Sequence, residues 1–308
     1  MRESTILRST LVGLAVALLS ATAQAQLFRA YLASDGNDAS PCTLQAPCRL
    51  LPAALNAVAS GGEIWMLDSA NYNTATVNIT KSVSILAIPG AVGSIVAQNG
   101  GPAVAITAGI VALRNVVIGP VAGAAPGTHG VTVTGSSTTV TIENSVIAGV
   151  PNNGVYVIGG AVKVANTVLR NNGQFAIVLD GGGSADVTTS QMLKNAGGGV
   201  YAGGSSGNAT ASVSDSIISD SNSGVRVATV TGGSARISVT RSTIAHTAQS
   251  LWCQGTGTNY VFLGGNLIAF NSAAWTVAEN CTGAYTAGNN QFNSNGAPTG
   301  TLTPLSLQ

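Results

Sequence analysis

The sequence predicts an all-β fold, a single-stranded parallel β-helix, from three observations. Only 7% of the 308 residues are charged, against about 25% in an average globular domain, while 45% are hydrophobic. Short apolar runs alternate with Gly, Asn and Ser, which indicates strands separated by turns. Two series of these runs recur with a common period, as expected of a chain that buries its apolar side chains in many thin layers.

The first series consists of seven six-residue segments that align without gaps. They begin at Leu113, Ile142, Val164, Val187, Val213, Val239 and Leu263. The starts run from 113 to 263 in six steps, a mean spacing of 25 residues. The sixth position is also apolar, at Ile118, Ile147, Leu169, Met192, Ile218, Ile244 and Ile268. We therefore expect the first and sixth positions to face the interior.

Two polar columns lie between these apolar positions. The third position holds Asn115, Asn144, Asn166, Thr189, Asp215, Arg241 and Gly265. The fourth position holds Val116, Ser145, Thr167, Ser190, Ser216, Ser242 and Asn266. Polar residues of these types favour bends and can form hydrogen bonds with their copies in neighbouring coils. We interpret both columns as structural ladders.

The second series falls between the first, and its segments begin at Gly130, Gly154, Ala176, Gly199, Gly224, Ser250 and Ala274. Its mean spacing is 24 residues, from 130 to 274 in six steps. A coil of about 24 residues can hold three short strands and three bends, and stacked coils pair in parallel about 4.8 Å apart. Propeller blades need about 40–50 residues. The common period therefore predicts a β-helix.

The chain outside the repeats divides into three further segments. Residues 1–25 have a basic start, an apolar stretch and a small-x-small cleavage site, which is typical of a secretory signal peptide. Residues 26–75 should form an N-terminal cap, where Leu51, Ala54, Leu55 and Val58 predict a short helix that stops at Gly61-Gly62. We expect coils over residues 76–285 and a C-terminal cap or tail over 286–308.

The four cysteines are Cys42, Cys48, Cys253 and Cys281. An exported chain meets an oxidising compartment, so two disulfides are expected, and four cysteines allow three pairings. We predict the two local pairs, Cys42–Cys48 and Cys253–Cys281. A metal site is the alternative, but no histidine lies near either pair and neither spacing is that of a zinc motif. We predict no metal and no cofactor.

The segment Tyr31-Leu-Ala-Ser-Asp-Gly-Asn-Asp resembles the start of secreted bacterial β-helix proteins, as do Pro41-Cys42, Pro47-Cys48-Arg49, Ala53-Ala54-Leu55 and Gly61-Gly62-Glu63-Ile64. The chain thus resembles the pectin-lyase-like (pectate lyase) superfamily over nearly its whole mature length. The resemblance implies a right-handed parallel β-helix and a secreted protein, periplasmic or extracellular. Members include pectate lyases, polygalacturonases and adhesins, so the fold does not settle the function.

Catalytic motifs of that superfamily are not found in the sequence. The acidic residues are scattered, whereas calcium-dependent lyases cluster aspartates and polygalacturonases pair them. Aligning the coils nevertheless places Lys194, Asp220 and His246 at one position, about 5 Å apart from neighbour to neighbour. This row could supply a base, an acid and an orienting charge, or it could be a set of solvated turn residues.

A second row lies on the other series, at Thr132, Tyr156, Val178, Tyr201, Arg226, Trp252 and Thr276. Alternation with inward apolar neighbours predicts that this row is exposed. Tyr156, Tyr201 and Trp252 could stack on sugar rings, and Arg226 could pair with the carboxylate of an acidic sugar. The alternative is the ordinary preference of aromatic residues for strands.

The sequence therefore supports three hypotheses. The first is a secreted β-helix protein that binds, and possibly modifies, an extracellular polysaccharide. The second is a non-catalytic structural or surface-interaction protein, adhesin-like, and the third is a lyase or hydrolase with an unfamiliar site. The 12 basic and 11 acidic residues form neither a basic stripe nor a polybasic cluster, which argues against nucleic acid and an anionic membrane surface as partners. The oligomeric state stays open.

Overall fold

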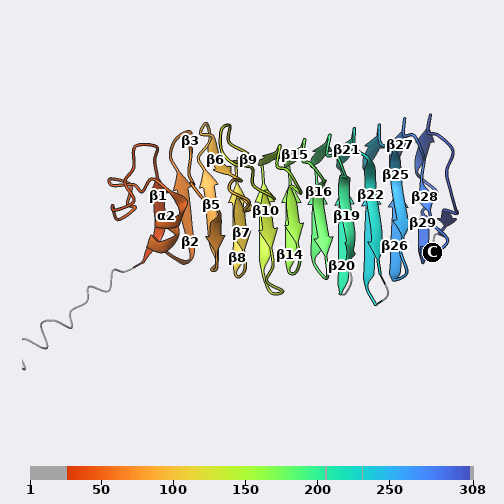
Figure 1. Cartoon of the computed structure of the whole chain (residues 1–308), viewed down its shortest axis with the longest axis horizontal. Coiled ribbons are helices and arrows are strands. Elements are labelled where there is room, and N and C mark those ends of the chain that lie inside the picture. The colour runs from red at the N-terminus through yellow and green to blue at the C-terminus, as the bar shows by residue number, and fades with distance from the viewer. Residues whose placement is uncertain (1–25, 205–206, 231, 306–308) are drawn as a thin grey trace, which may run out of the picture.

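The chain winds into a solenoid whose coils follow one another along a single axis (Figure 1). The computed structural model describes residues 26–204, 207–230 and 232–305, so the predicted signal peptide lies outside the described residues. From β2 to β28, each coil passes in turn through three sheets, and every strand pair between consecutive coils is parallel. The predicted parallel β-helix is confirmed.

Three sheets line the solenoid, named here by the number of strands found among the described residues. The twelve-stranded sheet comprises β1 (Leu27–Leu32), β2 (Val58–Met66), β5 (Val83–Ala87), β8 (Ile110–Arg114), β11 (Thr139–Glu143), β14 (Ala161–Ala165), β17 (Ser184–Thr188), β20 (Asn208–Ser214), β23 (Ser234–Thr240), β26 (Thr258–Gly264), β29 (Gly283–Thr286) and β31 (Thr303–Pro304). The ten-stranded sheet comprises β3 (Ala70–Asn71), β6 (Gly93–Val96), β9 (Val116–Gly119), β12 (Val146–Ala148), β15 (Val168–Arg170), β18 (Gln191–Leu193), β21 (Ile217–Ser219), β24 (Thr243–Ala245), β27 (Leu267–Ala269) and β30 (Gln291–Asn293). The nine-stranded sheet comprises β4 (Val77–Ile79), β7 (Val104–Ile106), β10 (Val131–Val133), β13 (Val155–Val157), β16 (Phe175–Asp180), β19 (Gly198–Gly204), β22 (Ser223–Thr229), β25 (Gln249–Gln254) and β28 (Thr276–Val277).

The registers of these sheets follow the aligned columns of the sequence. In the first series, Ile142 pairs with Val164 and Val164 with Val187, and the alignment continues in the same way to Leu263. The first and sixth positions are buried in every copy, as predicted. Each coil thus contributes at least two apolar side chains to one continuous core that runs the length of the solenoid.

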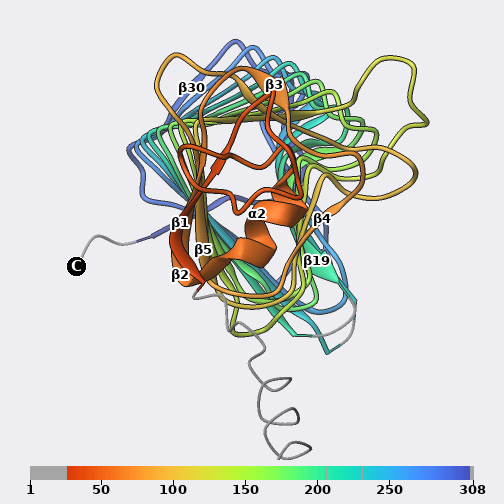
Figure 2. The same ribbon diagram turned by 90° about the vertical axis from the view of Figure 1, so that its left-hand side faces the viewer.

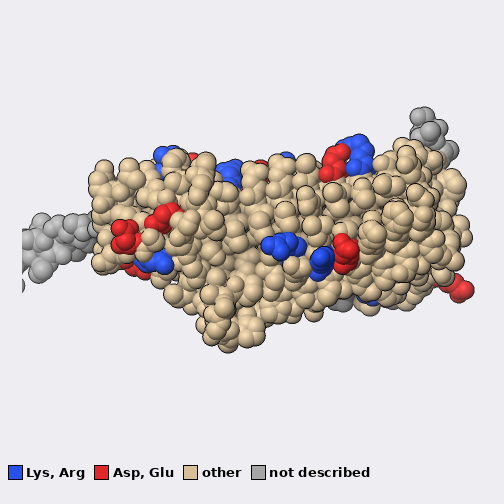
Figure 3. Space-filling model, turned by 90° about the horizontal axis from the view of Figure 1, so that it is seen from above, with Lys and Arg blue, Asp and Glu red and all other residues tan. Residues whose placement is uncertain are grey.

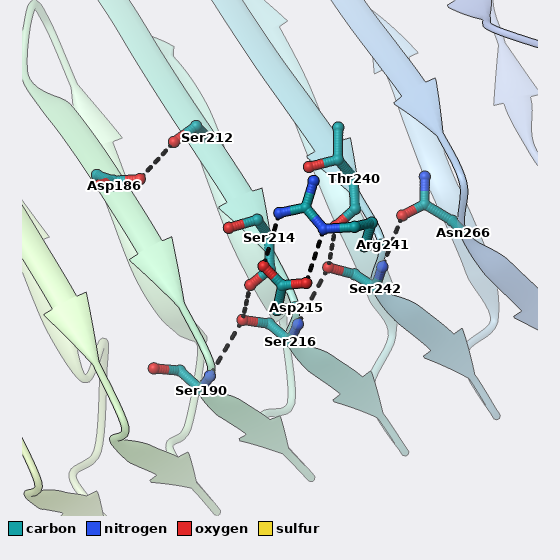
Figure 4. A network of polar contacts seen from close by, with 10 residues as sticks. All are labelled: Asp186, Ser190, Ser212, Ser214, Asp215, Ser216, Thr240, Arg241, Ser242 and Asn266. Atoms are coloured by element: carbon teal, nitrogen blue, oxygen red, sulfur yellow. Dashed lines mark hydrogen bonds and ion pairs between the residues drawn. The ribbon is translucent and has the colours of Figure 1, made fainter.

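The third position of the first series is a left-handed bend between the twelve-stranded and the ten-stranded sheets. All seven residues have positive φ, from 47° at Asn166 to 67° at Gly265. Asparagine and aspartate adopt this conformation more readily than other non-glycine residues, which explains the polar column. Where the position holds Asp215 and Arg241, the two side chains form an ion pair with an N–O distance of 2.7 Å (Figure 4).

The fourth position forms a buried hydrogen-bonded ladder, as the sequence suggested. The hydroxyl of Ser216 accepts a hydrogen bond from the backbone N–H of Ser190 at 3.1 Å. The hydroxyl of Ser242 in turn accepts one from the backbone N–H of Ser216, also at 3.1 Å. Asn266 continues the series by accepting from Ser242 at 2.9 Å (Figure 4). Each side chain satisfies a backbone group that a tight bend would otherwise leave unpaired inside the protein.

A second left-handed bend and a second ladder recur between the ten-stranded and the nine-stranded sheets. The bend residues are Asn171, Lys194, Asp220, His246, Phe270 and Ser294, with φ between 51° and 58°. The ladder residues follow each bend directly, at Asn172, Asn195, Ser221, Thr247, Asn271 and Asn295. This second ladder was not predicted from the sequence.

The N-terminal end of the solenoid is covered by the helix α2 (Leu51–Ala57), which lies across the opening (Figure 2). Leu51, Ala54 and Leu55 are its buried residues, as the spacing predicted. The predicted stop at Gly61-Gly62 is wrong. Val58 already has extended backbone, with φ −79° and ψ 142°, because it begins β2 and pairs with Leu27.

Both disulfides join the predicted pairs. The Cα atoms of Cys42 and Cys48 are 4.6 Å apart in the N-terminal region, and those of Cys253 and Cys281 are 5.5 Å apart near the other end. Strands of the sheets also extend beyond residues 76–285, with β1 to β3 before them and β30 and β31 after them. No helix among the described residues is long and apolar enough to span a membrane.

Candidate functional site

The outer face of the nine-stranded sheet carries the residues that the sequence proposed for ligand binding. Thr132, Tyr156, Val178, Tyr201, Arg226, Trp252 and Thr276, called the outer column, occupy one register position on seven consecutive strands. Neighbouring strands of a sheet lie about 4.8 Å apart. Tyr201, Arg226 and Trp252 therefore form an unbroken row over three coils, while Val178 separates Tyr156 from them.

The prediction that this column is exposed is only partly correct. Six of its seven residues are half-buried, and the seventh, Val178, is buried with 6% exposure. Side chains on neighbouring coils are close enough to stack, so each aromatic ring or guanidinium group shields part of its neighbour from solvent. Phe175 lies against Tyr201 with ring centroids 5.3 Å apart, and His129 stacks on Tyr156 at 4.7 Å.

Arg226 is held between two aromatic rings. Its guanidinium carbon lies 4.0 Å from the ring centroid of Trp252 and 5.7 Å from that of Tyr201. Among the described residues it forms no ion pair, and its buried Nε has no hydrogen-bond partner. Cation–π contacts orient the group without neutralising its charge. Arg226 therefore presents a fixed cation that can still bind an anion.

Asp180 is the second charged residue of this face. In the described strands of the nine-stranded sheet, Asp180 and Arg226 are the two residues with charged side chains. The hydroxyl of Tyr156 donates to Oδ2 of Asp180 at 2.8 Å, and no described residue forms an ion pair with this carboxylate. The face thus carries one cation and one anion, both without an ionic partner.

A shallow groove of about 330 Å³ lies beside the outer column. Its lining residues, here called the groove, are His129, Asn153, Tyr156, Gln174, Phe175, Val178, Asp180 and Tyr201. Four aromatic or imidazole rings and one carboxylate thus meet in one depression, a composition typical of sites that bind small polar molecules with apolar faces. Tyr156 and Tyr201 were predicted as binding residues from the sequence, whereas His129, Phe175 and Asp180 were not.

Burial alters the ionisation of the groove residues. It lowers the pKa of His129 from its ordinary value of 6.5, and His129 Nδ1 accepts the backbone N–H of Asn153 at 3.3 Å. Burial, together with the hydrogen bond to Asp180, raises the pKa of Tyr156 to about 12. Burial also raises the pKa of Tyr201. At neutral pH the groove therefore contains a neutral imidazole and protonated phenols.

We expect His129 to titrate below pH 6.5. Its folded pKa lies below the unfolded value, so on acidification the unfolded chain binds the proton first. The stability contributed by neutral His129 is thus present above pH 6.5 and is lost as the pH falls through the folded pKa. The chain has two histidines, so an NMR titration of the His246→Asn variant isolates His129. A midpoint at or above 6.5 would contradict the burial of this imidazole.

The predicted catalytic row lies elsewhere on each coil, at the second left-handed bend. Lys194, Asp220 and His246 stack as expected, and the backbone N–H of Lys194 donates to the carbonyl of Ser219 in the next coil at 3.0 Å. Their side chains are exposed, and within the described residues Asp220 forms no ion pair with Lys194 or His246. His246 instead stacks on Phe270, with centroids 5.4 Å apart. The structure brings these residues into one row, but within the described residues it forms no ion pair between them.

A comparable aromatic cluster on the twelve-stranded sheet offers a reference surface. The guanidinium carbon of Arg236 lies 5.4 Å from the ring centroid of Tyr260, and Tyr260, Phe262 and Tyr285 stack with centroids 5.3–6.2 Å apart. The remaining surface has few charges, and Figure 3 shows them scattered over the face seen from above. Arg236 and Tyr260 thus repeat the type of contact made by Arg226 and Trp252 outside the candidate site.

Known structures share this architecture. A pectate lyase, Pel9A, superposes with a TM-score of 0.56 at 16% sequence identity, over 92% of this chain and 79% of that chain. XylC in complex with xylose superposes with a TM-score of 0.53 at 9% identity, over 86% of this chain and 69% of that chain. No curated protein sequence matches the chain. The sequence model described as "Right handed beta helix region" matches residues 129–301, more than half of the chain, and the protein therefore belongs to the right-handed β-helix family.

Proposed function

We propose that the protein binds an acidic extracellular polysaccharide along the outer face of the nine-stranded sheet. The observation that carries this proposal is Arg226, an unpaired cation held between Tyr201 and Trp252. Planar guanidinium groups bind carboxylates through two parallel hydrogen bonds, and flanking rings offer apolar faces to sugars. The row is continuous over three coils, so an extended chain running along the solenoid axis can contact its members in turn.

The groove composition favours binding over glycoside hydrolysis. Hydrolysis of a glycosidic bond commonly uses two carboxyl groups about 5–9.5 Å apart. The described residues of the groove include one, Asp180. We therefore propose a binding protein. The row of Lys194, Asp220 and His246 stays a separate hypothesis for catalysis, without a side-chain contact to support it.

The fold and the disulfides accord with this proposal. The similar structures include a lyase named for pectate and a complex with xylose, although at 16% and 9% identity they bear on the fold alone. Two disulfides are typical of proteins from oxidising compartments. Secretion, to the periplasm or the medium, is thus part of the proposal, and residues 1–25 remain the predicted signal peptide.

We expect Arg226→Ala and Trp252→Ala to weaken polysaccharide binding. Loss of one cation or stacking contact should cost about 1 kcal/mol, which raises Kd about fivefold. Because both side chains lie on the outer face, the melting temperature should change little. Isothermal titration with acidic oligosaccharides, after a glycan-array screen that includes neutral chains, measures the effect.

Arg236→Ala and Tyr260→Ala are the matched controls, because they remove the same kinds of side chain from the twelve-stranded sheet. They should leave Kd unchanged. If no glycan binds the parent protein, or if all four variants bind alike, the face is not a polysaccharide site. The structural or surface-interaction hypothesis then takes its place.

A further inference from the structure

Asp180 and Arg226 divide the binding face into two parts of opposite charge. Asp180 lies on β16 and Arg226 on β22, with β19 between them. Two strand spacings separate the two positions by about 10 Å along the solenoid axis. Tyr201 of β19 lies between the two charges, and its phenol interacts electrostatically with both.

Asp180 lines the groove, and no cation among the described residues neutralises its carboxylate. Oδ2 accepts the hydroxyl of Tyr156 at 2.8 Å, and no described group donates to Oδ1. A sugar carboxylate that reaches this position would meet a like charge in a partly desolvated groove, which is strongly unfavourable.

The length of a sugar residue converts this charge pattern into a rule for the ligand. A pyranose residue is comparable in length with one coil spacing, so a chain along the axis places one sugar over Arg226, the next over Tyr201 and the third over Val178, whose strand carries Asp180 two residues further on, on the same face. If the first sugar carries the carboxylate that binds Arg226, the third must be uncharged. A polymer with a carboxylate on every sugar, or on every second sugar, breaks this rule.

We propose that this face selects acidic polysaccharides in which the second sugar after the carboxylate-bearing one is uncharged, which excludes polymers with a carboxylate on every sugar or on every second sugar. This inference rests on the proposed function and adds a class of ligand to it. Arg226 binds the carboxylate, and Asp180 rejects chains of higher charge density. Asp180 is thus a specificity residue and not a source of affinity for the anion.

The test compares three sets of oligosaccharides of equal length by isothermal titration. Gellan oligosaccharides carry one uronate in four sugars, hyaluronate oligosaccharides one in two, and oligogalacturonate one on each sugar. EDTA is present, because a divalent cation could bridge two carboxylates. The wild-type protein should bind the gellan oligosaccharides most tightly.

The variant Asp180→Asn removes the charge and keeps an oxygen that can accept the Tyr156 hydroxyl. Its Kd for hyaluronate and galacturonate oligosaccharides should fall roughly tenfold, while that for gellan oligosaccharides changes less than about twofold. The matched control is Asp186→Asn on the twelve-stranded sheet, since Asp186 also accepts a hydroxyl, that of Ser212 at 2.6 Å, and lies outside the groove (Figure 4). This control should leave all three affinities unchanged.

If Asp180→Asn and Asp186→Asn change the three affinities equally, the effect is one of long-range charge alone and the inference is overturned. The inference is also overturned if oligogalacturonate binds the wild type most tightly. A change of melting temperature in Asp180→Asn is checked separately by calorimetry. If Arg226→Ala weakens binding but Asp180→Asn leaves the preference unchanged, this inference fails and the proposed function stands. If none of the three oligosaccharides binds any variant, the proposed function fails as well.

Discussion

Replacement of Ile218 by aspartate should unfold much of the solenoid. Ile218 has 0% exposure, and its neighbours in the column are Met192 and Ile244 on the adjacent strands. A carboxylate at this position has no cation or hydrogen-bond donor to compensate it, and burial of an uncompensated charge costs several kcal/mol. That cost approaches the whole stability of an ordinary domain, about 5–15 kcal/mol. Far-ultraviolet circular dichroism and thermal melting measure the loss.

The matched control is the preceding residue of the same strand. Ile217 is 43% exposed because alternation turns it outward. Ile217→Asp should therefore lower the free energy of unfolding by no more than about 1 kcal/mol, and its melting temperature should stay close to that of the parent protein. If Ile218→Asp also melts like the parent, the sixth position of the repeat does not face the core.

The Asn195→Leu variant should lose about 3 kcal/mol of stability. Asn195 Oδ1 accepts the backbone N–H of Asn172 at 3.1 Å, and its Nδ2 donates to the carbonyl of Leu169 at 3.0 Å. Leucine has a similar volume but removes the oxygen that accepts the backbone N–H of Asn172 and, at 2.9 Å, its side-chain Nδ2, and each buried donor left unpaired costs about 1–3 kcal/mol. Urea denaturation gives the difference in the free energy of unfolding.

Gln191→Leu is the appropriate comparison, because Gln191 lies on β18 of the same coil with an exposed side chain. Its stability should change by less than about 0.5 kcal/mol. Similar losses in the two variants would mean that the second ladder does not contribute to stability through its buried hydrogen bonds.

Much of the fold could be predicted from the sequence because one column of the repeat becomes one register line of a sheet. A slip of one residue would turn Val164 and its copies from the core to solvent, so the apolar columns determine the pairing. The second ladder was missed because its residues lie outside the aligned segments. Those segments end at Leu169 and Met192, three residues before Asn172 and Asn195.

The candidate site was predicted less completely. The alternation of apolar and polar residues predicted the outer column. Its half-burial depends on the orientation of neighbouring side-chain rings, which the spacing of residues in the sequence does not determine. His129 and Phe175 precede the first residues of their second-series segments, and Asp180 follows the last apolar residue of its own. Extending the alternation of the second series would have placed Asp180 on the outer face, but it gives His129 and Phe175 the parity of the inward residues, so their place beside the groove could not be predicted in this way.

The disulfide between Cys253 and Cys281 has a consequence for how the solenoid comes apart. In a stack of coils each coil contacts only its neighbours, so the terminal coils are the ones that fray. The bond has a sequence separation of 28, little more than one coil, and joins β25 to the segment that follows β28 in the next coil. The coil from β26 to β28 cannot peel away while this bond is closed, whereas β29, β30 and β31 follow Cys281 and are not held by it. Unravelling in an oxidising medium is thereby hindered at that end, and a reducing agent releases it.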